Sequence, residues 1–290
     1  MGIKEEIGKS FREGTTLTKL IYINLGVFVL IGLTSSILGL FNVPTEWTHL
    51  LMLPAGFEAW LQTPWTIITY MFFHTGFIHI LFNVLMLFWF GRIFLQFFSQ
   101  KDLVGLYIMG GIAGGALYMI SYYIFPVFSG QLGNSFLLGA SASIMAIMIG
   151  MAVTAPNYSV QLVFIGKIPL KWIAVVSVIL SLLNVASVNA GGEISHLGGA
   201  FAGYVFAAQH RKGHNITSGL NRFLDAIVNL FKRKPKLKVT HQRPLSDKEY
   251  NFRKKQENDA IDRILEKIKK GGYESLSKEE KQTLFQFSQK

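Results

Sequence analysis

The chain has 290 residues, of which 50% are hydrophobic and only 16% are charged. A soluble domain usually carries about a quarter charged residues, and here long stretches contain no charged residue at all. This pattern predicts a protein that crosses a membrane several times. Cysteine is absent, which excludes disulfides, a thiol nucleophile and cysteine-based metal sites. The net charge of +11 lies in tails and loops, where it sets membrane topology, so we do not expect nucleic-acid binding.

The first 19 residues mix basic and acidic side chains and lead into an apolar run long enough to cross a bilayer. We therefore expect residues 1–19 to be a cytoplasmic segment and not a cleaved signal peptide. Six apolar segments, each a predicted helix, occupy residues 20–41, 66–98, 103–128, 140–155, 172–188 and 194–208. The long connection after the first segment contains tryptophan, which favours the membrane interface.

Positively charged residues occur in every second connection between the apolar segments, and this pattern predicts the membrane topology. Lys and Arg occur before the first segment, after the second, after the fourth and after the sixth, and the other three connections contain neither. By the positive-inside rule, both termini are cytoplasmic. The sequence therefore predicts an all-α polytopic membrane protein, with a six-helix domain over residues 20–210 and a basic cytoplasmic tail over residues 211–290. We expect it in a bacterial inner (cell) membrane.

The tail contains three features that the pattern of apolar residues predicts. Residues 220–231 have helical spacing and suit a helix lying on the inner leaflet, and residues 232–244 form a basic linker. Ser246 with Glu249, and Ser277 with Glu280, fit capping boxes at the starts of two short helices. One face of the first helix would carry Ile261, Ile264, Leu265 and Ile268. We interpret this region as a solvated tail with amphipathic helices and find no chemistry in it.

Polar side chains inside membrane segments are costly and indicate functional sites. Three histidines, His74, His79 and His196, lie within or beside the predicted segments, and all five aspartates lie outside them. This excludes a pair of catalytic aspartates within the membrane. The chain also lacks a His-Glu-x-x-His motif, so we predict no metal and no cofactor.

Four polar groups come to a similar depth under this topology, because the second, fourth and sixth segments all run inward. Ser141 and His196 begin the fourth and sixth segments, and His79 and Asn83 share one face of the second. A serine hydroxyl becomes a nucleophile when a histidine takes its proton. The side chains of His79 and Asn83, with the free N–H groups at a helix start, can stabilise an oxyanion. No acidic third member is visible within the segments, so we predict a Ser–His dyad.

Small residues favour close packing beside this site. Gly199 and Gly203 form a GxxxG pair just after His196, and such pairs permit two helices to approach closely. We expect this pair to bring the sixth segment against the fourth.

Three motifs together resemble the rhomboid intramembrane serine proteases over about residues 20–210. They are His74-x4-His79-x3-Asn83, Gly139-Ala140-Ser141 and His196-x2-Gly199-x3-Gly203. The resemblance implies that Ser141 is the nucleophile, His196 the base, and His79 and Asn83 the oxyanion-stabilising side chains. It also implies a supporting role for Gly139, which precedes the nucleophile, and for His74.

The resemblance implies substrates too, namely single-span membrane proteins cleaved in or near the outer part of their transmembrane segment. Two positions depart from the family pattern. Ala142 stands where glycine is usual, and Met145 stands where many members have tyrosine. An alternative is a catalytically inactive rhomboid-like protein that binds transmembrane clients. The presence of both Ser141 and His196 favours the protease, since inactive relatives typically lack one of them. A protein whose polar residues merely join helices, and a transporter, fit the whole set less well.

Overall fold

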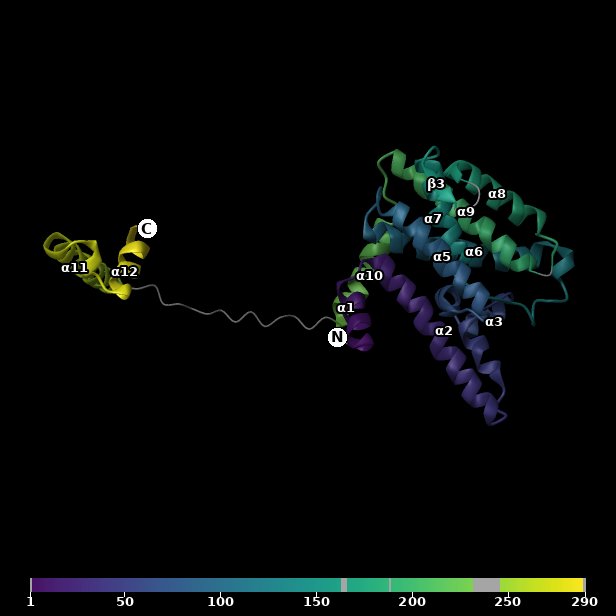
Figure 1. The fold of residues 1–290 in the computed structure, drawn as a ribbon. Coiled ribbons are helices and arrows are strands. Elements are labelled where there is room, and N and C mark those ends of the chain that lie inside the picture. Colours follow the sequence, from purple (N-terminus) through teal and green to yellow (C-terminus); the bar gives the residue numbers. More distant parts are fainter. Residues whose placement is uncertain (1, 163–165, 188, 232–245, 289–290) are drawn as a thin grey trace. The chain divides into compact units, whose positions relative to one another are not determined.

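The structure is a computed structural model, which describes residues 2–162, 166–187, 189–231 and 246–288. The chain forms two compact units, Met1–Lys232 and Arg233–Lys290, and Figure 1 draws both. The predicted linker over residues 232–244 lies outside the described residues.

The first unit is built almost entirely of helices (Figure 1). Its α-helices are α1 (Ile3–Glu13), α2 (Thr16–Leu40), α3 (Phe57–Gln62), α4 (Thr66–Thr69), α5 (Phe77–Phe94), α6 (Gln100–Ile124), α7 (Ser141–Thr154), α8 (Leu170–Leu183), α9 (Ala190–Arg211) and α10 (Ser218–Phe231). Three 3-10 helices accompany them: η1 (Thr45–Leu51), η2 (Tyr70–Phe72) and η3 (Pro126–Phe128). Two short antiparallel strand pairs join β1 (Leu53–Pro54) to β2 (Phe136–Leu137) and β3 (Ser159–Leu162) to β4 (Gly166–Pro169).

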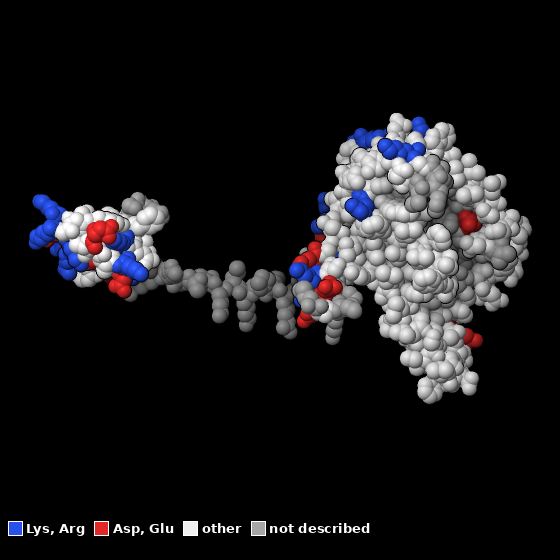
Figure 2. Space-filling view, viewed as in Figure 1, with Lys and Arg blue, Asp and Glu red and all other residues white. Residues whose placement is uncertain are grey.

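Helices α2, α5 and α6 are long and apolar enough to cross a membrane, and α7 and α8 are shorter apolar helices. Large apolar side chains point outward from these helices; on α2, Leu30 is 66% exposed and Leu33 is 59% exposed. Most of the surface in Figure 2 carries no charge, and Lys and Arg gather near β3 and near α1 and α10. An apolar exterior of this kind suits lipid as the surrounding solvent, and the unit is a helical membrane domain.

The second predicted segment, 66–98, is not one continuous helix. It consists of α4, η2, an extended stretch at 73–76, and then α5. The break is stabilised because its polar groups bond to other segments: the Tyr70 carbonyl accepts from Gly139 N–H, and the Tyr70 hydroxyl donates to Gly111 O. Apolar composition alone did not reveal this break.

The sixth predicted segment was also placed wrongly at its start. We predicted a helix from residue 194, but α9 begins at Ala190 and therefore includes Glu193 in its first turn. A search for hydrophobic runs leaves out Gly191, Gly192 and Glu193, which are not apolar. They are helical because α9 packs against neighbouring helices from its first residues, where Ala190 and Gly191 are buried.

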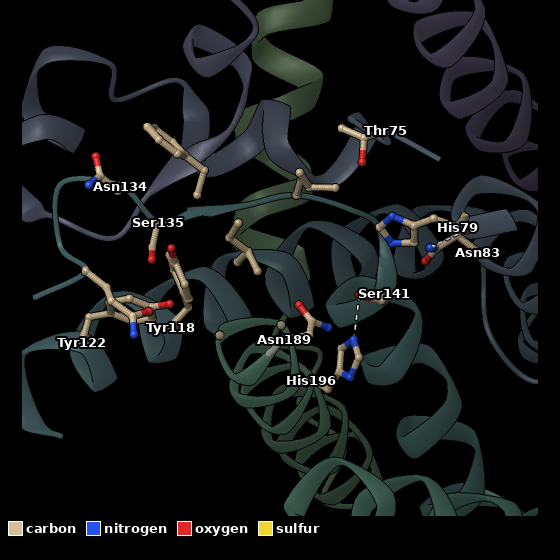
Figure 3. Close-up of a pocket in the computed structure, with 16 residues that line it drawn as sticks. Thr75, His79, Asn83, Tyr118, Tyr122, Asn134, Ser135, Ser141, Asn189 and His196 are labelled. Atoms are coloured by element: carbon tan, nitrogen blue, oxygen red, sulfur yellow. Dashed lines mark hydrogen bonds between the residues drawn. The ribbon is translucent and has the colours of Figure 1, made fainter. Parts of the chain in front are cut away.

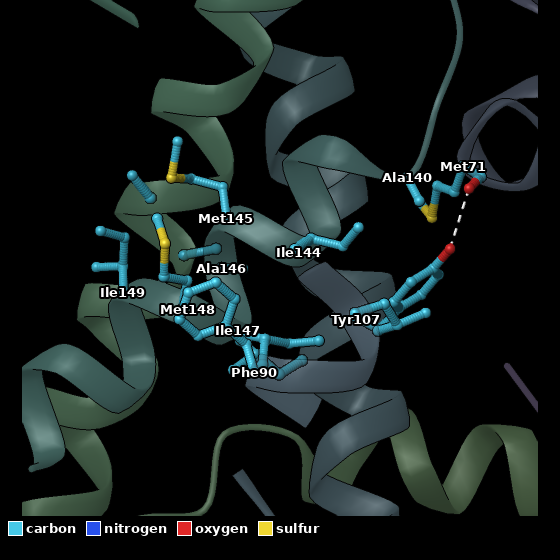
Figure 4. Close-up of a cluster of buried hydrophobic side chains, with 14 of the residues drawn as sticks. Met71, Phe90, Tyr107, Ala140, Ile144, Met145, Ala146, Ile147, Met148 and Ile149 are labelled. Carbon is cyan, nitrogen blue, oxygen red and sulfur yellow. Dashed lines mark hydrogen bonds between the residues drawn. The ribbon is translucent and has the colours of Figure 1, made fainter. Parts of the chain in front are cut away.

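The core of this unit lies where α6, α7 and α9 meet, and Figure 4 shows part of it. Glycines allow the close approach. The backbone of Ala142 lies against Gly199, and the backbone of Ala146 lies against Gly203, so α9 packs directly on α7. A side chain on Gly114 of α6 would meet the Ala142 methyl group at 2.6 Å.

Gly199→Ala is expected to destabilise the domain by about 1–3 kcal/mol, the usual cost of overpacking. The added methyl group would overlap the Ala142 carbonyl, which is backbone and cannot rotate away. Gly26→Ala on α2 is the matched control, because nothing lies within 4 Å of the methyl group it adds. The thermal unfolding midpoint of the two variants in detergent checks this. Equal midpoints would contradict the packing described here.

One polar network fixes the N-terminal end of α6 to the segment before α10. Ser99 caps α6, and its hydroxyl donates to Asp102 Oδ2 at 2.7 Å. The other carboxylate oxygen accepts from Asn215 Nδ2 and from Thr217 Oγ1, both at 2.8 Å. Because hydrogen bonds to a charged group are stronger than neutral ones, this network ties α10 to the bundle.

The second unit is a pair of helices, α11 (Asp247–Gly271) and α12 (Lys278–Ser288), joined by η4 (Tyr273–Ser275). Ser246 and Glu249 form the predicted capping box. The first helix is not short, however, because it has 25 residues. Ile261, Ile264 and Leu276 form a small core, whereas Leu265, which we predicted on the same face, is 49% exposed.

Charged groups support the second helix of this unit. Glu280 accepts from the Ser277 N–H at 2.7 Å, as the predicted cap requires, and from Lys267 Nζ at 2.9 Å. The Lys267 ammonium holds the pKa of the Glu280 carboxyl below its usual value. This ion pair is at the surface, so its contribution to stability is small.

Candidate active site

The turn before α7 requires glycine at position 139. Gly139 has φ +110°, a conformation that residues with side chains rarely adopt. A Cβ atom there would also lie 2.9 Å from the ring of His79. Both facts explain why a glycine precedes this turn, and they place His79 directly against it.

His74 holds the same turn through a hydrogen bond to its backbone. Its side chain is 3% exposed, and its Nε2 accepts from the Ala140 N–H at 3.3 Å. Its other ring nitrogen, Nδ1, then carries the proton and donates to Phe72 O at 3.3 Å. His74 lies in the extended stretch before α5, so it is not on the helix that carries His79. It holds the turn and does not line the cavity described below.

Ser141 is the first residue of α7, and its hydroxyl meets a histidine from another helix. His196 Nε2 lies 2.8 Å from Ser141 Oγ, a hydrogen bond drawn as a dashed line in Figure 3. Ile144 is the first residue of α7 to bond back, to Ala140 O. The N–H groups of the first turn are therefore free of intrahelical partners and point toward the start of the helix.

His79 and Asn83 lie across from this pair, on α5 (Figure 3). Asn83 Nδ2 donates one hydrogen to His79 O at 2.9 Å, which leaves its second hydrogen available. Ser141, His196, His79 and Asn83 all line one cavity of about 670 Å³. The rest of its wall is rich in polar side chains, including Thr75, Gln131, Asn134, Ser135 and Asn189.

A second cavity, of about 270 Å³, meets the first at Asn83, Ser141 and His196. It is apolar, and its remaining walls come from α5, α7 and α8: Phe82, Met86, Phe90, Ile144, Met145, Met148 and Ser177. The serine and histidine therefore lie between a polar space and an apolar one.

The two departures from the family pattern occupy different places. Met145, at the position where many members of the family have tyrosine, lines the apolar cavity together with His196. Ala142 is 1% exposed, and its methyl group faces Gly114 of α6 and not the cavity. This methyl group therefore does not narrow the space beside Ser141.

Sequence reasoning missed several residues of this site. Tyr118 and Tyr122 of α6 line the polar cavity, and Glu193 contacts His196. The spacing of Glu193 and His196, three residues apart, would have indicated the contact had α9 been given its true start. In the part of the chain that the structure describes, no cluster of three or more His, Asp or Glu side chains could hold a metal ion.

These observations define a class of protein. It has a helical membrane domain in which a serine and a histidine are hydrogen-bonded between a polar and an apolar cavity. Comparison with known families matches the Rhomboid domain to residues 61–212, just over half of the chain. The chain belongs to the rhomboid family, as its three motifs predicted.

A relative and a second family add to this. The chain is 27% identical over 157 residues to RHOMBOID-like protein 12, mitochondrial, from Arabidopsis thaliana, a match that covers 51% of this chain and 47% of the relative. The chain thus spans about half the length of this curated relative. Residues 246–290, which include α11 and α12, match a family of unknown function (DUF6576).

Proposed function

We propose that this chain is an intramembrane serine endopeptidase that hydrolyses peptide bonds in or near transmembrane segments of membrane proteins. The observation that carries the proposal is the 2.8 Å contact between His196 Nε2 and Ser141 Oγ at the junction of the two cavities. The polar cavity suits water, and the apolar one suits a substrate side chain. Membership of the rhomboid family supports the same reaction.

The proposed topology has six membrane helices, α2, α5, α6, α7, α8 and α9, with both termini in the cytoplasm. The distribution of Lys and Arg along the sequence supports it. Under this topology Ser141 and His196 lie near the outer ends of their helices, and the basic tail is cytoplasmic. A bacterial inner membrane stays a prediction; the relative named above is mitochondrial.

The chemistry follows from the contacts. The Ser141 oxygen attacks the scissile carbonyl while its proton passes to His196 Nε2. The carbonyl oxygen becomes an oxyanion, stabilised by His79, by the free hydrogen of Asn83 Nδ2 and by the N–H groups at the start of α7. The intermediate collapses, the C–N bond breaks, and the leaving amine takes the proton from His196. Water from the polar cavity then attacks the acyl carbon while one of its protons passes to His196 Nε2; the bond between the acyl carbon and Ser141 Oγ breaks, and Ser141 takes that proton back.

The proposed substrates are single-span membrane proteins whose helix unwinds locally to expose a peptide bond. The apolar cavity between α5, α7 and α8 supports lateral entry beside α8, since its walls continue the lipid-facing surfaces of α5 and α8.

The test is cleavage of a model single-span substrate by the full chain reconstituted in liposomes, with the products mapped by mass spectrometry. We expect one main cut in the outer part of the substrate's transmembrane segment. A substrate that is bound but left intact would contradict the proposal and favour the alternative, an inactive client-binding protein.

A further inference from the structure

The second ring nitrogen of His196 also has partners. Nδ1 lies 3.2 Å from Glu193 Oε2 and 3.2 Å from Ser181 Oγ. Glu193 lies three residues before His196 on α9, so the two side chains meet on one face of the helix. Ser181 comes from α8 and is 3% exposed. Two oxygen atoms therefore face the nitrogen that is turned away from Ser141.

These partners decide where the imidazole proton lies. A carboxylate can only accept a hydrogen bond, so Nδ1 carries the proton and donates to Glu193. Nε2 is then left with its lone pair, which faces the Ser141 hydroxyl at 2.8 Å. This is the tautomer that a general base needs, because only an unprotonated Nε2 can take the serine proton. The Ser181 hydroxyl can accept from Nδ1 as well, and it adds no charge.

We propose that Glu193 is a positioning residue for His196: it holds the imidazole in this tautomer and stabilises the imidazolium that forms when Ser141 attacks. The inference rests on the proposed function. It extends the predicted dyad to a Ser141–His196–Glu193 relay of contacts, with the roles that a buried aspartate has in serine-protease triads. The Glu193 and His196 side chains are 19% and 20% accessible, so solvent weakens the effect relative to a fully buried acid.

Few other charged or titratable groups face His196. His79 faces the same cavity from α5, and Tyr118 and Tyr122 face it from α6. None of the described residues that line the two cavities is Lys, Arg, Asp or Glu. Glu193 therefore supplies the negative charge that contacts His196.

Glu193→Gln keeps the shape of the side chain and removes its charge. We expect kcat/KM for substrate cleavage to fall roughly 10- to 100-fold at neutral pH, less than for a buried triad acid. The acidic limb of the kcat/KM profile should move to lower pH, because the variant lacks the carboxylate that favours a protonated imidazole. Glu193→Asp keeps the charge and should leave that limb where the parent has it.

Two controls complete the experiment, which uses the full chain in liposomes. Ser181→Ala removes the neutral partner of Nδ1 and should leave the pH profile unchanged. Glu58→Gln removes an exposed carboxylate on α3 and should keep the parent's activity. The thermal unfolding midpoint of each variant identifies a loss that is only structural.

The outcomes separate the two proposals. If Glu193→Gln cleaves like the parent, or loses activity without any shift of the acidic limb, Glu193 does not act through His196 and the inference is wrong, although the protease assignment stands. If Ser141→Ala cleaves as well as the parent, the proposed function itself fails.

Discussion

Ser141→Ala is expected to reduce substrate cleavage by roughly 10⁴-fold or more, to the background of the assay. The variant lacks the oxygen atom that lies 2.8 Å from His196 Nε2, and no other hydroxyl in the structure contacts that nitrogen among the described residues. The measurement is the rate of product formation in liposomes under single-turnover conditions. Substrate binding should remain, because the two cavities keep their other walls.

Ser143→Ala is the matched control, since it makes the same chemical change two residues further along α7. The Ser143 side chain is 0% exposed, and its hydroxyl lies in the core without a hydrogen-bond partner. Its removal should leave both activity and stability close to those of the parent. If both serine variants lost activity equally, the effect would belong to α7 as a whole and would contradict a specific role for Ser141.

Asn83→Ala is expected to reduce kcat roughly 10²- to 10³-fold, the usual cost of losing one oxyanion donor. KM should change little, because the donor acts on charge that develops only in the transition state. The Asn83 side chain is 7% exposed, and it lines both cavities beside Ser141. His79→Ala should have an effect of the same kind, and the double variant tests whether the two groups act together.

Asn134→Ala is the control for this prediction. Asn134 lines the same polar cavity, but it lies on the far side from Ser141 (Figure 3). It should retain the parent's kcat. A raised KM with normal kcat in Asn83→Ala would show a role in substrate binding and would contradict oxyanion stabilisation.

Composition and periodicity predicted the helical membrane domain well, because apolar runs and charge-free connections are direct consequences of the bilayer. The four predicted polar groups, Ser141, His196, His79 and Asn83, come together at one cavity. Their meeting could be anticipated because, under the predicted topology, the second, fourth and sixth segments run in the same direction, and Ser141 and His196 begin the fourth and sixth.

Features that depend on tertiary contacts could not be read in this way. The break before α5 exists because the Tyr70 carbonyl bonds to Gly139, a partner 69 positions along the chain. The start of α9 depends on packing of glycines that hydropathy does not count. Glu193 was missed for the same reason, since it was assigned to a connection and not to the helix that presents it to His196.

Labelling with a fluorophosphonate tests the activation of Ser141 by His196 without knowledge of the natural substrate. A fluorophosphonate forms a bond between phosphorus and an activated serine oxygen, with loss of fluoride, and the serine proton passes to the neighbouring base. We expect a single adduct on the parent chain, mapped by mass spectrometry to Ser141, and its loss in His196→Ala. An adduct on another serine, or equal labelling of Ser141 in His196→Ala, would contradict the claim that His196 activates Ser141.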